Sequence, residues 1–72
     1  MIKFKNDMLG ICDVMIAYGN VYLLKSEKGN EKYIVTVDLD IYAGNWRCGN
    51  YFKAFNDALK LFKELISFYT DK

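Results

Sequence analysis

Histidine and proline are missing from this chain, and cysteine is scarce. The 72 residues include no histidine, no proline and only two cysteines, Cys12 and Cys48. Without histidine, the commonest general base for hydroxyl and thiol catalysis is absent. Two cysteines far apart in sequence cannot by themselves complete a structural zinc site. We therefore expect a non-enzymatic protein without a metal or other cofactor, in which both cysteines are small buried apolar residues.

Neither sign of charge dominates, and long hydrophobic runs are also missing. Ten basic residues face nine acidic ones, for a formal net charge of +1, which argues against a strongly basic nucleic-acid binder. No run approaches the roughly 18 consecutive apolar residues of a membrane helix. The first residues, Met1 to Lys5, lead into Asn6-Asp7 rather than into the apolar core of a signal peptide. We expect a cytoplasmic protein with no membrane partner.

What the chain does contain is apolar and aromatic residues, at 53% and 17% of the sequence. That content excludes a disordered tail, and the length predicts one domain spanning residues 1–72, near the lower limit for a stable core. Lysine greatly outnumbers arginine, and asparagine, isoleucine, tyrosine and phenylalanine are plentiful. This bias is typical of AT-rich coding sequence, and it suggests a phage, a mobile element or a low-GC bacterium as the source.

The clearest element of the sequence is an amphipathic helix predicted over Tyr51–Thr70. Apolar residues recur there at helical spacing and form a wide stripe, while lysines and acidic residues fill the opposite side. Asn50 could cap this helix. A later start at Ala54 would instead place Asp57 in the first turn, where an acidic side chain suits the helix dipole.

Four Gly-Asn pairs divide the part of the chain before the helix. Gly-Asn suits a two-residue turn, because glycine readily adopts the positive φ that a type II′ turn requires at its first position. The pairs predict an antiparallel meander of three to four strands, which gives an α+β fold with the helix packed on one face. Residues 9–18 fit a strand in that meander, although a helix capped by Asp7 and ended by Gly19 fits them as well. Residues 2–5 alternate apolar and basic side chains, as in a short edge strand.

A two-residue loop at Gly29-Asn30 would fix the register of the second hairpin. It sets Leu24 opposite Val35 and Tyr22 opposite Val37. The helix should then cover the apolar face formed by Met15, Ala17, Tyr22, Leu24, Tyr33, Val35 and Val37. One helix cannot cover both sides of a sheet, so the mixed opposite face is expected to remain free for a partner protein or a second copy.

Two further groups of residues have a possible binding role. Asp38 and Asp40 could supply oxygen ligands to magnesium, but no other acidic residue is grouped with them. They are more typical of exposed strand residues that keep a sheet edge from pairing. The aromatic residues around Trp46 and Arg47 could close the core, anchor a protein interface or stack nucleic-acid bases.

These patterns predict a small protein-binding module. Its action could be that of an inhibitor of a host enzyme or of a defence nuclease, as in anti-CRISPR-type proteins, and homodimerisation is compatible with it. The alternative is a nucleic-acid-binding module that uses sheet aromatics with lysine and arginine. The expected partner-binding residues are Tyr18, Val21, Leu23, Lys25, Ile34, Thr36, Tyr42, Trp46 and Arg47.

Overall fold

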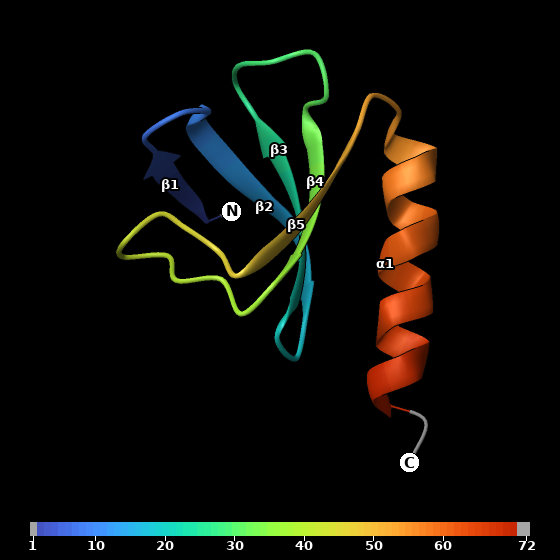
Figure 1. The fold of residues 1–72 in the computed structure, drawn as a ribbon. Coiled ribbons are helices and arrows are strands. Elements are labelled where there is room, and N and C mark those ends of the chain that lie inside the picture. The colour runs from blue at the N-terminus through green and yellow to red at the C-terminus, as the bar shows by residue number, and fades with distance from the viewer. Residues whose placement is uncertain (1, 71–72) are drawn as a thin grey trace.

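Five short strands precede a single long helix in the computed structural model, which describes residues 2–70, without the side chains of residues 69 and 70. The elements are β1 (Lys3–Asn6), β2 (Gly10–Tyr18), β3 (Val21–Ser26), β4 (Tyr33–Val37), β5 (Cys48–Phe52) and α1 (Phe55–Thr70). The strands form one antiparallel sheet in the order β1-β2-β3-β4-β5, and α1 packs on one face of it (Figure 1). The predicted α+β fold is confirmed, with five strands rather than three to four.

The first hairpin has the predicted two-residue turn. Tyr18 pairs with Val21, and Gly19 has a φ of 60° between them. Residues 10–18 are therefore a strand, which decides between the two interpretations of this stretch. Along β2 the register changes between Val14 and Ile16, so that Met15 is the extra residue of a β-bulge. Because of the bulge, Val14 and Ile16 face opposite sides of the sheet.

The second hairpin has a different register from the predicted one. Leu23 lies opposite Val35 and Leu24 lies opposite Ile34, a shift of one residue. The chain does not turn sharply at Gly29-Asn30, because the backbone N–H groups of Glu27 and Lys28 still donate to the carbonyls of Ile11 and Leu9. A shift of one residue exchanges the two faces of a strand relative to its neighbour. The predicted apolar face is therefore wrong, since Leu24 and Val35 point to opposite sides.

The sheet consequently has an apolar core on each side. The helix-side core contains Val21, Leu23 and Val35 with Ala58 and Phe62 of α1. On the other side, the buried residues are Phe4, Cys12, Val14, Leu24 and Ile34. The helix begins at Phe55 rather than at Tyr51, close to the later of the two predicted starts, because residues 51 and 52 pair with β4.

The connection between β4 and β5 covers the side of the sheet that faces away from the helix. Its residues Leu39, Ile41 and Trp46 pack against the core on that side. The connection is joined to β1 by a hydrogen bond of 2.8 Å from Asn6 Nδ2 to the carbonyl of Gly44. The expectation of an uncovered second face is therefore wrong, because the sheet curls and the chain's own connection fills the concave side (Figure 1). Within residues 2–70, no helix is long and apolar enough to cross a membrane.

Candidate functional site

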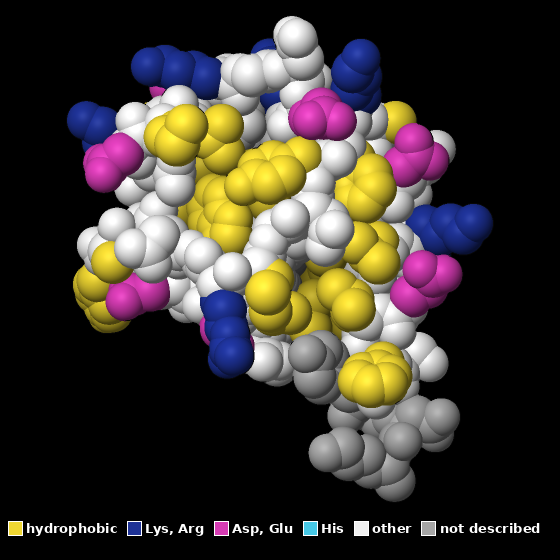
Figure 2. Space-filling model, in the orientation of Figure 1, with side chains coloured by type: hydrophobic (Ala, Val, Ile, Leu, Met, Phe, Trp, Pro, Cys, Tyr) yellow, Lys and Arg dark blue, Asp and Glu magenta, His cyan; other side chains and the backbone are white. Residues whose placement is uncertain are grey.

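A partly open hollow lies where the two ends of the sheet approach each other. It has a volume of about 370 Å³ and is lined by Asn6, Met8, Leu9, Asn45, Trp46 and Tyr51. These residues come from the β1–β2 turn, from the end of the β4–β5 connection and from β5. In the space-filling view, hydrophobic side chains gather in this hollow and along the seam between β5 and α1 (Figure 2).

Trp46 and Tyr51 form the aromatic wall of the hollow. The indole Nε1 of Trp46 donates a hydrogen bond of 3.3 Å to the Tyr51 hydroxyl, and the two ring centroids are 6.5 Å apart. The Trp46 ring also meets the buried Phe4 ring edge-on, with centroids 6.3 Å apart and an interplanar angle of 79°. Gly49 leaves room for the indole, since a Cβ at that position would lie 2.6 Å from Nε1. Contacts with Tyr51, Phe4 and Gly49 therefore determine the position of the Trp46 ring.

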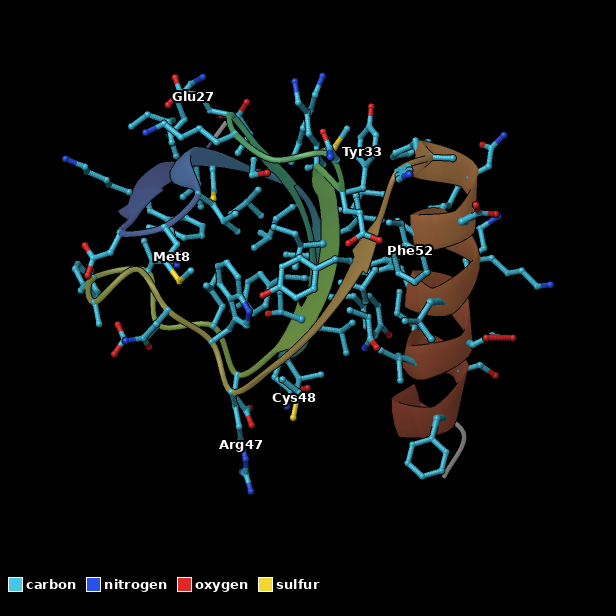
Figure 3. All side chains as sticks on the ribbon, turned by 45° about the horizontal axis from the view of Figure 1, so that its top comes forward. Met8, Glu27, Tyr33, Arg47, Cys48 and Phe52 are labelled. Carbon is cyan, nitrogen blue, oxygen red and sulfur yellow. The ribbon has the colours of Figure 1, made fainter. Side chains whose placement is uncertain are left out.

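Asn6 positions the opposite wall. Its Oδ1 accepts hydrogen bonds from the backbone N–H groups of Met8, at 2.9 Å, and of Leu9, at 3.0 Å. Its Nδ2 is the group that donates to Gly44. The turn that presents Met8 is thus fixed at both of its sides, while the Met8 side chain is 85% exposed beside the hollow (Figure 3). An exposed methionine on a fixed turn is a flexible apolar contact surface.

No charged side chain is among the six residues that line the hollow. Arg47, next in sequence to Trp46, points away from the body of the molecule and lies 3.7 Å from Asp38 (Figure 3). Lys25 is elsewhere, with its Nζ 5.8 Å from the centre of the Tyr33 ring. The hollow is therefore suited to an uncharged group rather than to an anion.

The predicted binding residues do not form one surface. Val21, Leu23, Ile34 and Thr36 are buried, so the interpretation of them as an exposed face is wrong. The exposed ones are dispersed over the surface: Tyr18, Lys25, Tyr42 and Arg47. Trp46 is the single member of the predicted set that lines the hollow.

Sequence reasoning missed the residues that complete the hollow. Met8 and Leu9 follow Asn6-Asp7, a pair of residues typical of turns, so a local signal for an exposed apolar turn existed. Their approach to Trp46 depends on the hydrogen bond between Asn6 and Gly44, which are 38 positions apart. No spacing in the sequence indicates such a contact.

The two aspartates and the two cysteines have separate surroundings. Asp38 lies just after β4 with a φ of 55° and accepts a hydrogen bond from Asn20, whereas Asp40 accepts one from the backbone of Ala43. They stabilise two turns and are not strand residues at an edge. Among the described residues, no three histidine, cysteine or acidic side chains are grouped so that they could hold a metal ion.

Cys12 is buried as expected, but Cys48 is exposed on β5, which contradicts the expectation for that residue. Burial raises the pKa of the Cys12 thiol, and the neighbouring charges of Asp13 and Glu27 raise that pKa further. Cys12 is thus a neutral, poorly nucleophilic thiol.

Comparison with known proteins adds no relative to this description: no protein-family model, curated protein or solved structure matches the chain.

Proposed function

We propose that this chain is a non-enzymatic protein-binding module, and that the hollow at Trp46 and Tyr51 holds a short uncharged, apolar peptide segment of another protein. The observation that carries the proposal is a solvent-open hollow whose aromatic wall is fixed by a hydrogen bond and close packing, opposite the exposed Met8 side chain on a hydrogen-bonded turn. Tryptophan and tyrosine contribute strongly at protein interfaces because they bury a large area with few rotatable bonds. A volume of about 370 Å³ is within the range of ligand pockets.

The distribution of charge favours a peptide over nucleic acid. A nucleic-acid site needs lysine or arginine beside the aromatic rings, since phosphate contacts supply most of the affinity. Lys25, Lys32 and Arg47 are the cations that such a site would use. Lys25 and Lys32 lie around a different, polar depression with Asp13 and Glu27, and Arg47 points away from the hollow. The aromatic wall therefore lacks the cations that a phosphate backbone requires.

Binding of an apolar peptide segment is compatible with the expectation that the protein is an inhibitor. A small domain that binds a segment of an enzyme would inhibit that enzyme by covering part of the enzyme's surface, without catalysing a reaction. The proposal needs no cofactor and no catalytic group.

The test is a selection of phage-displayed random peptides on the parent chain, followed by titration of the selected synthetic peptides into parent and variant proteins. Trp46 is the only tryptophan, so its fluorescence reports on the hollow directly. We expect uncharged, apolar peptides with micromolar affinity that changes little between about 50 and 500 mM salt. Tyr51→Ala should weaken binding at least tenfold. Tyr42→Ala is the matched control, because Tyr42 is fully exposed and lies outside the hollow.

Two results would contradict the proposed peptide site. Peptides that bind Tyr51→Ala as well as they bind the parent would overturn the assignment of the site. Failure to select any peptide, combined with salt-sensitive quenching of Trp46 by a single-stranded oligonucleotide, would favour the nucleic-acid alternative.

A further inference from the structure

Within residues 2–70, the outer edge of the second half of β2 has no partner strand. β1 pairs with β2 only over residues 10–13, and the N–H of Val14 donates to the carbonyl of Ile2 at 2.9 Å. Beyond that contact, no described residue pairs with the outer side of residues 15–18. Because Tyr18 closes the two-residue turn against Val21, its backbone groups face β3, and those of Ala17 face outward. Ala17 therefore offers a backbone donor and an acceptor to another strand.

The side chains on one face of this edge are partly exposed. Ile16 lies opposite Leu23 and Tyr18 lies opposite Val21, so their side chains project on the side of the helix. The helix packs mainly on β3, β4 and β5. Ile16 remains 36% exposed and Tyr18 remains 52% exposed. An apolar strip thus runs along the side of the helix.

Charged residues and proline, two of the usual protections of a sheet edge, are missing here. Natural edges are protected by charged residues or by proline, as β1 is by Lys3 and Lys5. The chain has no charged residue between Asp13 and Lys25 and no proline at all. The bulge at Met15 and the turn at Gly19 limit the regular free edge to Ile16, Ala17 and Tyr18.

We propose that two copies of the chain pair antiparallel along this edge, about a two-fold axis at Ala17. An uncharged edge is self-complementary, because bringing it against its own copy costs no charge repulsion. A two-fold axis perpendicular to the sheet places both helices on the same side. In the groove between the two helices, Ile16 of each copy then packs against Tyr18 of the other. The partly exposed side chains of the two edges are thereby buried. The opposite end of β2 carries the turn with Met8 and Leu9, so the hollow stays open and this proposal is independent of the peptide site.

The first measurement is sedimentation velocity of the full chain from about 10 µM to 1 mM. An edge of three residues is smaller than a standard interface, so we expect a reversible dimer with a dissociation constant of about 0.1–1 mM. Ile16→Lys should abolish it. The matched control is Ile11→Lys, on the same strand and 42% exposed, where β1 already occupies the edge. Far-UV circular dichroism verifies that both variants are folded.

A second measurement tests the axis itself. Since Ile16 faces Tyr18 across the axis, a mixture of Ile16→Lys with Tyr18→Glu should form heterodimers, although neither variant associates alone. Amide hydrogen exchange of the parent should slow at Ala17 as concentration rises from 10 µM to 1 mM. A parent that stays monomeric at 1 mM overturns the proposal. So does a dimer that Ile16→Lys leaves intact, or one that forms without protection of Ala17.

Discussion

Substitution of Gly49 by alanine tests how the aromatic wall is held. The new Cβ would lie 2.6 Å from Trp46 Nε1 and 3.2 Å from the Tyr51 hydroxyl, so the indole has to move. Movement breaks the hydrogen bond between the two side chains, at a cost of about 0.5–1.5 kcal/mol, and overpacking adds about 1–3 kcal/mol. The backbone at Gly49 is outside the left-handed region, so alanine recovers about 0.4–1 kcal/mol by restricting the unfolded chain. The net loss in the free energy of unfolding should be about 0.5–4 kcal/mol.

Urea denaturation at 25 °C, followed by circular dichroism and by Trp46 emission, measures both consequences of this change. A domain of this length has a total stability of about 4–11 kcal/mol, so Gly49→Ala should fold, with shifted Trp46 emission and weaker binding of any selected peptide. Gly19→Ala is the control. Its Cβ meets nothing within 4 Å, but a φ of +60° makes alanine unfavourable there. It should lose about 1–2 kcal/mol without any change in native emission. Identical stability and emission for Gly49→Ala and the parent would show that the indole does not occupy the described position.

Two substitutions in the cores give further expectations. Phe62→Ala should reduce the free energy of unfolding by about 3–5 kcal/mol, because Phe62 is 3% exposed between α1 and the sheet. Lys63→Ala, on the exposed side of the helix, should change it by less than about 0.5 kcal/mol, and equal effects of the two would contradict the assigned helix face. Thr36→Val should raise the free energy of unfolding by about 1–2 kcal/mol, since Thr36 Oγ1 is buried without a hydrogen-bond partner among the described residues. A loss of stability in urea titrations of Thr36→Val would show that this hydroxyl has a partner, such as a buried water molecule.

The elements that local pattern determines were predictable. The helix and the turn at Gly19-Asn20 each have a signal within a few residues. Local pattern fits residues 10–18 as a strand or as a helix, and the structure decides for the strand. The start of the helix was misplaced because Tyr51 and Phe52 continue the helical spacing of apolar residues. In the structure they pair with Ile34 and Tyr33 of β4. A strand partner far away in the sequence therefore overrides a local periodicity that extends beyond the helix.

The faces of the sheet were not predictable, because two small irregularities determine them. One is the bulge at Met15, and the other is the continued pairing of Glu27 and Lys28 with the β2 side. Each moves the register by one residue, and a shift of one residue reverses which side chains face the helix. The expected partner-binding face failed for this reason, since it depended on an ideal two-residue loop at Gly29-Asn30.

Only part of the candidate site was predictable, because some of its residues are close in sequence and others are brought together by the whole sheet. Trp46 and Tyr51 are five positions apart, and they meet because Gly49 between them has no side chain that would displace the indole. Met8 and Leu9 reach them only because the sheet curls until the β1–β2 turn meets the β4–β5 connection. Curl is a property of the whole sheet, produced by strand twist and by the bulge.

The curl of the sheet determines which apolar surfaces are left for a binding partner. A flat sheet with one helix would leave an entire apolar face exposed, and such a face would need a companion protein. The structure buries that face under the chain's own connection, with Leu39, Ile41 and Trp46 as the cover. Two smaller accessible apolar surfaces have a definite shape: the hollow beside Trp46 and the short edge at Ala17. These two surfaces are at opposite ends of β2, so peptide binding and self-association can be lost separately, and variants of one surface are controls for the other.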